Sequence, residues 1–122
     1  MNELDIPIVK KLDDLYRTFH EYRRVVPKQD RFTLFERSES LILEVIEFVL
    51  AGSTIASPAH KAAALDRASA KLNVLRFLVR LLKEVRAIDS KKYLILQEMI
   101  DETGRMLGGW IRSANAAARG RE

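Results

Sequence analysis

Apolar residues recur along the first part of the chain at alternating steps of four and three positions. This stripe contains Ile8, Leu12, Leu15, Phe19, Tyr22 and Val26. Because an α-helix turns by ~100° per residue, such a stripe lies on one face of a bundle helix. We predict a helix that begins near Asp5 as N-cap, has Pro7 in its first turn and ends at Pro27, because the residue before a proline leaves the α region.

The same spacing appears again between about Arg31 and Ala51. This second stripe contains Leu34, Ser38, Leu41, Val45 and Phe48, and it is widened by Ile42, Ile46 and Val49. We expect Gly52 to follow the helix as its C′ residue, because glycine adopts a positive φ without steric cost. The segment from Gly52 to Pro58 is rich in turn-forming residues and is the longest predicted connection.

Two more helices are predicted in the second half of the chain. One runs from about Ala59 or His60 to Ala87, and the other from about Lys91 to Ala114, with Asp89-Ser90 available as its cap. The pattern predicts an all-α, antiparallel up-and-down four-helix bundle over residues 1–114. We expect residues 115–122 to form a flexible basic tail that frays.

The third predicted helix is apolar on two sides. One stripe contains Ala68, Leu72, Leu75, Val79 and Leu82, and the other contains Val74, Phe77, Leu78, Leu81 and Val85. A partner subunit is the simplest cover for the second stripe, which we therefore predict to be an oligomer interface. The alternative is a central helix that is contacted on two sides within one chain.

The fourth predicted helix contains three glycines near its end, Gly104, Gly108 and Gly109. Each glycine inside a helix costs ~1 kcal/mol relative to alanine. Gly104 and Gly108 share a face, which permits another backbone to approach closely, and apolar Trp110 follows them. We interpret all four residues as helix-packing positions, and we expect Gly108 to contact a facing helix. The alternative is a weak or broken helix end.

Composition and charge describe an ordinary globular protein with an uneven charge distribution. The chain has 122 residues and no cysteine, and its net charge is 21 − 17 = +4. Residues 1–60 carry 8 − 10 = −2, whereas residues 61–122 carry 13 − 7 = +6. A basic second half favours phosphate-bearing or acidic partners. No signal-peptide pattern and no apolar run of ~18 residues occurs, so we expect a cytoplasmic protein.

Sequence motifs for catalysis are missing. His20 and His60 are far apart, and neither has a metal-ligating residue three or four positions later. Glu44 and Glu47 are three positions apart, but a di-iron bundle needs Glu-x-x-His motifs. No phosphate loop, nucleophile elbow or zinc spacing is found. We therefore expect a binding protein and not an enzyme, with no catalytic residues, metal or cofactor.

A basic strip is the best candidate for binding. Arg76, Arg80 and Lys83 lie along one face of the third helix. We expect four further arginines to join them in a nucleic-acid-binding surface: Arg105, Arg112, Arg119 and Arg121. The planar guanidinium of arginine gives phosphate two N–H donors at once. In the alternative interpretations, Arg76 and Arg80 pair with glutamates of a neighbouring helix, or the strip is only a solvated face.

Two segments resemble a known family. Lys71-x-x-x-Leu75-Arg76-Phe77-Leu78-Val79-Arg80-Leu81-Leu82 and Gly104-Arg105-Met106-Leu107-Gly108-Gly109-Trp110-Ile111 are similar to the accessory variability determinant (Avd) proteins of diversity-generating retroelements. Pro7 and Arg31-Phe32-Thr33-Leu34 also fit. Proteins encoded in intervening sequences of bacterial large-subunit ribosomal RNA genes share this four-helix fold.

The resemblance implies a homopentameric barrel with a basic surface, in which Arg76, Arg80, Arg105 and Arg112 match the basic positions of the family. In the retroelement branch it also implies two partners, a reverse transcriptase and its template RNA or DNA, which are used in mutagenic copying of a variable gene region. In the intervening-sequence branch it implies a structural or interaction module without a nucleic-acid role. A neighbouring reverse transcriptase gene would distinguish the two branches.

Overall fold

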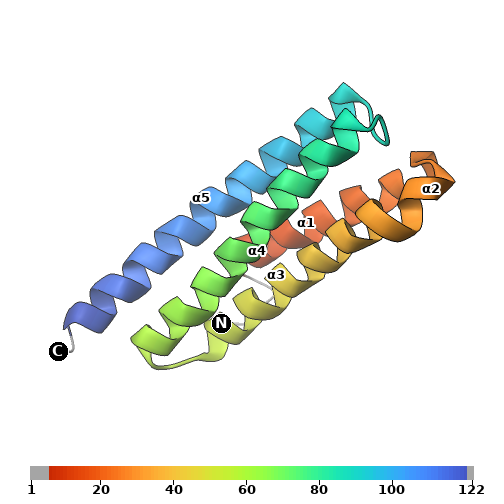
Figure 1. Ribbon diagram of the computed structural model, residues 1–122. Coiled ribbons are helices and arrows are strands. Elements are labelled where there is room, and N and C mark those ends of the chain that lie inside the picture. The colour runs from red at the N-terminus through yellow and green to blue at the C-terminus, as the bar shows by residue number, and fades with distance from the viewer. Residues whose placement is uncertain (1–5, 121–122) are drawn as a thin grey trace.

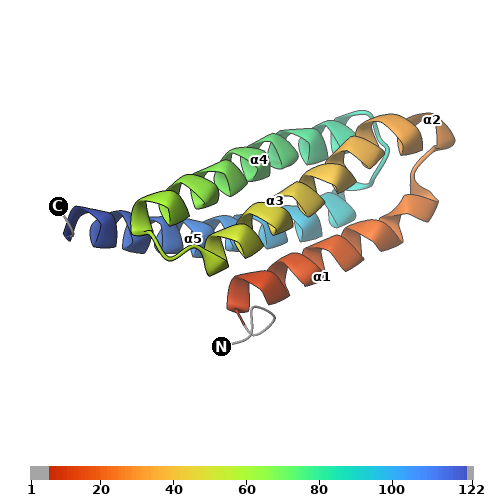
Figure 2. The ribbon, with the colours of Figure 1, turned by 90° about the horizontal axis from the view of Figure 1, so that it is seen from below.

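Four long helices form the protein in the computed structural model, which describes residues 6–120 (Figure 1). They are α1 (Pro7–Tyr22), α3 (Glu36–Thr54), α4 (Pro58–Glu84) and α5 (Ser90–Gly120). Three short helical pieces connect α1 to α3: η2 (Arg23–Val25), α2 (Lys28–Asp30) and η3 (Arg31–Phe35). The long helices alternate in direction (Figures 1 and 2), so the predicted all-α, up-and-down bundle is confirmed.

Each long helix packs against two neighbours. Helix α1 contacts α3 and α5, and α4 contacts the same two helices from the other side of the bundle. The predicted stripes meet in the core, where Leu12, Leu15 and Phe19 of α1 are fully buried together with Leu75 and Leu82 of α4. The hydrophobic spacing of the sequence therefore identifies the buried faces correctly.

The ends of α1 differ from the prediction. Its N-cap is Ile6, which cannot cap with its side chain, and the predicted cap Asp5 lies outside the described residues. The α-helix stops at Tyr22 and continues as the 3₁₀ turn η2. Val26 is extended, with ψ 130°, because Pro27 excludes it from the α region. The proline thus ends the helical segment where we expected.

A π-helical turn leads into α3. Helical structure resumes at Lys28, earlier than the predicted Arg31, and η3 is π-helical from Arg31 to Phe35. This turn places Phe35 on Phe19 of α1, with ring centroids 4.2 Å apart and planes 10° from parallel. Hydrophobic spacing did not indicate the π-helix, because its wider turn is decided by this tertiary contact and not by local propensity.

Gly52 has a different role from the one predicted. It lies inside α3, which continues to Thr54, and no glycine among the described residues has a positive φ. A Cβ atom at Gly52 would lie only 2.8 Å from Cδ2 of Leu65 on α4. The glycine therefore permits the close approach of α3 and α4, and the predicted C′ role is wrong. The connection to α4 is correspondingly short, Ile55–Ser57.

The turn between α4 and α5 contains a residue with a left-handed backbone. Helix α4 ends at Glu84, before the predicted Ala87, and Arg86 has φ 64°. The Arg86 N–H donates to the Lys83 carbonyl, and the Ala87 N–H donates to the Leu82 carbonyl, which is the Schellman arrangement. Asp89 then caps α5 as predicted, because its Oδ1 accepts the Lys92 N–H at 2.8 Å. This hydrogen bond lowers the pKa of Asp89.

Helix α5 extends through most of the predicted tail. It continues past Ala114 to Gly120 and projects beyond the other three helices (Figure 2). The helix boundary at Ala114 was therefore wrong, whereas the flexibility of residues 115–120 stays a prediction. No helix within residues 6–120 combines the length and the apolar character needed to cross a membrane.

The glycines of α5 do not all pack tightly. A Cβ at Gly104 would lie 3.3 Å from Nη2 of Arg76 and 3.7 Å from Cδ2 of Leu72, so Gly104 does face α4 closely. A Cβ at Gly108 or Gly109 would meet only the side chain of Arg112 of the same helix, at 3.4 and 3.8 Å, and no atom of a facing helix among residues 6–120 within 4 Å. The expected contact between Gly108 and a facing helix is therefore not made among the described residues.

We predict opposite effects for two glycine-to-alanine substitutions. Gly52→Ala should destabilise the protein by about 1 kcal/mol, because overpacking against buried Leu65 costs ~1–3 kcal/mol and helix propensity returns only ~1. Gly108→Ala, the matched control, should stabilise it by about 0.5–1 kcal/mol, because only the flexible end of Arg112 is near. Denaturant unfolding measures both values. A destabilising Gly108→Ala substitution would contradict the open environment described for Gly108.

Candidate nucleic-acid interface

The second apolar stripe of α4 remains largely uncovered within the chain. Val74, Phe77 and Val85 are 46%, 49% and 53% exposed, and Leu81 is partly exposed. Only Leu78 packs against the core from this stripe. Since α3 and α5 cover the first stripe, the alternative of a helix contacted on both sides within one chain does not account for the second stripe. Its burial by another subunit stays a prediction.

A groove between α4 and α5 brings part of the basic strip together. It is lined by Asn73, Arg76, Phe77, Arg80, Tyr93 and Gln97. Arg76 spans the two helices: its Nη2 lies 3.2 Å from Oδ1 of Asp101 on α5, and its Nη1 donates to Oδ1 of Asn73 at 2.8 Å. The pairing with a neighbouring helix that we considered from the sequence is therefore present for Arg76, with an aspartate as partner.

Arg80 is engaged on its own helix. Its Nε lies 3.1 Å from Oε1 of Glu84, and its guanidinium carbon lies 4.9 Å from the centre of the Phe77 ring. Both members of the ion pair are 55% exposed. Exposed pairs of this kind contribute only ~0–1 kcal/mol, so a phosphate can displace the carboxylate at small cost. The pairing does not prevent Arg80 from binding an anion.

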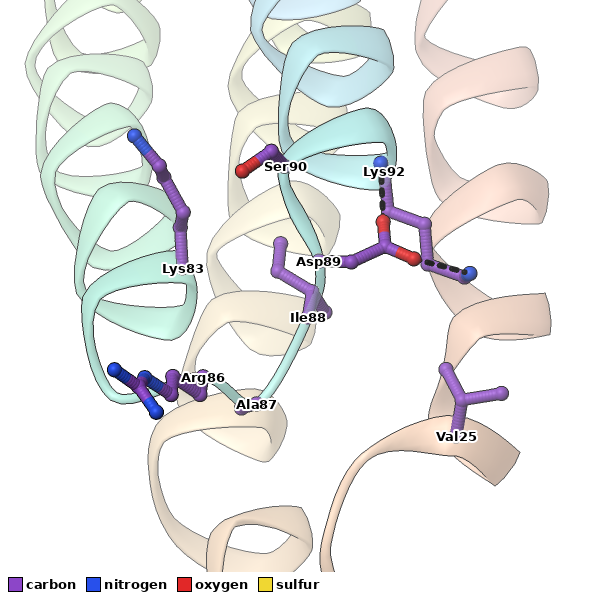
Figure 3. A pocket seen from close by; sticks show the side chains of 8 residues that line it. All are labelled: Val25, Lys83, Arg86, Ala87, Ile88, Asp89, Ser90 and Lys92. Carbon is purple, nitrogen blue, oxygen red and sulfur yellow. Dashed lines mark hydrogen bonds and ion pairs between the residues drawn. The ribbon is translucent and has the colours of Figure 1, made fainter.

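Lys83 lies near the end of the bundle, beside a separate hollow at the α4–α5 turn. Its Nζ lies 4.9 Å from the centre of the Tyr93 ring. The hollow is lined by Val25, Lys83, Arg86, Ala87, Ile88, Asp89, Ser90 and Lys92 (Figure 3). Figure 3 shows Lys83 and Arg86 on one side of it and the Asp89–Lys92 ion pair on the other.

The predicted arginines of α5 line a different hollow or lie farther along the helix. Arg105 pairs with Glu102 and lines a different hollow, with Lys11, Glu98, Met99 and Asp101. Its hydrogen bond lowers the pKa of Glu102. Arg112 and Arg119 are exposed farther along α5, and Arg121 lies outside the described residues. The structure therefore places Arg76 and Arg80 in one groove and Arg105 in a hollow that also contains Asp101, the ion-pair partner of Arg76. The binding of nucleic acid by these arginines stays a prediction.

A basic cluster that was not predicted from the sequence lies at the corner between α1 and α3. Arg23, Arg24 and Arg31 line a hollow there together with His20 and Glu21, and Phe32 is exposed beside them. The negative net charge of residues 1–60 concealed this cluster, because the average extends over the acidic faces of two helices. The pair Arg23-Arg24 and the nearby Arg31-Phe32 were the available signal.

Among residues 6–120, no group of three or more His, Asp or Glu side chains is arranged to hold a metal ion. Ionisable side chains instead form ion pairs, some of them within one helix and others between two helices. Glu44 of α3 is an example: it contacts Arg37 of its own helix at 2.9 Å and Lys71 of α4 at 3.2 Å. The hydrogen bond from Arg37 is the main cause of the lowered pKa of Glu44.

We predict that alanine substitutions of Arg76 and Arg80 differ in their effect on stability and that both weaken nucleic-acid binding. Arg76→Ala should lower the free energy of unfolding by about 0.5–1 kcal/mol, because it breaks the link to Asp101. Arg80→Ala should change it by less than about 0.5 kcal/mol. If both arginines bind phosphate, each substitution should reduce the slope of the logarithm of nucleic-acid affinity against the logarithm of salt concentration by ~0.7–0.9.

The control is Arg17→Ala on α1, which removes an exposed arginine that pairs with Asp13. Unfolding and binding at several salt concentrations are measured on the same proteins. If the salt slope is the same in all three variants, the strip binds no phosphate.

Comparison with known proteins supports the resemblance seen in the two C-terminal segments. A family model described as bAvd-like matches residues 6–114, which include α1, α3, α4, most of α5 and both segments. A search of curated proteins finds no match. Because the family model extends over well more than half of the chain, the protein belongs to the bAvd-like family.

Proposed function

We propose that the protein is a non-enzymatic accessory protein of a diversity-generating retroelement. In this proposal it binds the reverse transcriptase and its template RNA or DNA through basic surface residues, and so supports mutagenic reverse transcription. The observation that carries the proposal is the match of the Avd-type family over residues 6–114. The basic second half of the chain, with a net charge of 13 − 7 = +6, supports a polyanionic partner.

Assembly into a homopentamer is part of the proposal. The exposed apolar side chains Val74, Phe77 and Val85 form a contact surface on α4 that α3 and α5 leave open. Apolar surface of this kind gains ~25 cal/mol for each Å² that a second copy covers. A ring of copies would also repeat the basic groove of each subunit, which raises the affinity for a long polyanion through multivalency.

One observation favours the alternative function, a structural or interaction module of the ribosomal RNA intervening-sequence type. Arg76, Arg80 and Arg105 each already pair with a carboxylate of the same chain. A surface whose cations are paired presents less net positive charge to a nucleic acid. The two functions therefore differ in whether these pairs open when a polyanion binds.

Capture of the reverse transcriptase tests the proposal directly. The tagged chain, co-expressed with a reverse transcriptase encoded beside its gene, should retain that enzyme and its template RNA at low salt. Charge reversal of two exposed arginines, Arg80→Glu with Arg112→Glu, should reduce the retained RNA at least tenfold, because binding to phosphates is lost and repulsion is added.

The control Arg17→Glu on α1 is matched in charge to each single variant, Arg80→Glu or Arg112→Glu, and should retain both partners. If the wild-type chain retains neither reverse transcriptase nor RNA, the accessory function is wrong. Equal losses in the control would assign the effect to net charge and not to these residues.

A further inference from the structure

One end of the bundle concentrates positive charge from two distant parts of the chain. The α1–α3 corner and the α4–α5 turn lie at the same end (Figures 1 and 2). Residues 21–32 and 83–92 together carry eight Lys or Arg and four Asp or Glu, a net of 8 − 4 = +4. Val25 of the corner also lines the hollow at the α4–α5 turn, so the two parts adjoin (Figure 3).

The corner presents an aromatic ring to solvent among these cations. Phe32 is 61% exposed, and the guanidinium carbon of Arg23 lies 5.1 Å from the centre of its ring. The ring is held on a structured turn, because the adjoining Phe35 is buried on Phe19. Phe32 therefore offers an apolar flat surface in a fixed place.

The arginines of the corner differ from those of the basic strip. Within residues 6–120, Arg23, Arg24 and Arg31 form no ion pair with a carboxylate, whereas Arg76, Arg80 and Arg105 each form one. Arg31 instead stabilises the turn, since its Nε donates to the Val26 carbonyl at 3.0 Å and its Nη2 donates to the Arg24 carbonyl at 3.4 Å. Glu21 is the carboxylate that lines the hollow beside them.

We propose that this corner binds single-stranded nucleic acid, with one base stacked on Phe32 and the adjacent phosphates bound by Arg23 and Arg24. Cations around an exposed aromatic ring are the combination that single-strand binding proteins use, because the ring accepts any base and the cations bind the backbone. A duplex does not offer a free base face. Arginine and phenylalanine also occur at protein interfaces. The net charge of 8 − 4 = +4 at this end of the bundle favours a polyanion over a protein partner.

The proposal rests on the proposed nucleic-acid role but uses residues outside the basic strip. It also supplies an aromatic contact outside the strip, at a ring that is more exposed than Phe77 of the α4–α5 groove, 61% against 49%. The corner and the strip would then contact different parts of one strand, or two strands.

The test compares Phe32→Ala with Leu94→Ala, which removes an apolar side chain of the same exposure, 60%, from α5. The probes are a fluorescein-labelled oligothymidylate of about 12 nucleotides and an abasic strand of the same length. Phe32→Ala should weaken binding of the oligothymidylate about 5- to 150-fold, the range for loss of one stacked base. It should change binding of the abasic strand less than about twofold, and Leu94→Ala should change neither.

Two further variants separate stacking from charge. Phe32→Trp should bind the oligothymidylate about as tightly as the wild type, because it keeps an aromatic face. Arg24→Ala should weaken binding of both strands and reduce the salt slope by ~0.7, the value for one phosphate on a single strand.

The stacking site would be overturned if Phe32→Ala and Leu94→Ala bound the oligothymidylate with equal affinity. It would also be overturned if Phe32→Ala lost the same affinity for the oligothymidylate and for the abasic strand. In that case the proposed function is unaffected as long as the wild type binds the strands. If the wild type binds neither strand at low salt, the nucleic-acid role itself is wrong. If the wild type binds the oligothymidylate in a Phe32-dependent way but does not retain the reverse transcriptase, only the accessory function is overturned.

Discussion

Helix α4 carries more apolar surface than its neighbours α3 and α5 cover, and the proposed assembly depends on this excess. Leu75 and Leu82 are fully buried against the rest of the bundle, whereas Val74, Phe77 and Val85 stay about half exposed. The hydrophobic effect favours any arrangement that removes such a stripe from water. The polar edge of the same helix, with Arg76 and Arg80, faces the groove towards α5. Helix α4 thus presents an exposed apolar stripe and, beside it, a basic edge.

The arginines of the two candidate binding surfaces differ in their ion pairing. In the α4–α5 groove, Arg76 and Arg80 are held by Asp101 and Glu84, so an anion must displace a carboxylate before it binds. At the end of the bundle, Arg23 lies over Phe32, and the arginines of the α1–α3 corner have no such pairs within the described residues. An anion that binds at the corner would therefore compete with fewer carboxylates than one that binds in the groove.

The sequence predicts the four helices and their buried faces, because hydrophobic spacing is a direct consequence of helix geometry. It also predicts the Asp89 cap and the effect of Pro27, both of which are local. The sequence-based predictions are wrong where a contact between helices, and not the local sequence, determines the structure. Gly52 was assigned to a helix end, but the nearby Leu65 of α4 explains why glycine lies there. The π-helical turn before α3 depends on the stacking of Phe35 on Phe19. The candidate site was only partly predictable. Helical spacing places Arg76 and Arg80 on one face but does not reveal the ion pair of Arg76 with Asp101. The basic α1–α3 corner was concealed because the net charge was averaged over residues 1–60.

The central claim is that α4 completes its burial in a symmetric assembly, and that the binding surfaces act as repeated copies on that assembly. Light scattering of the wild-type chain at micromolar concentration measures this most directly, because the mass of one subunit is 14.0 kDa. The account predicts a single species of about five times that mass. A monomer of 14.0 kDa at this concentration would contradict it.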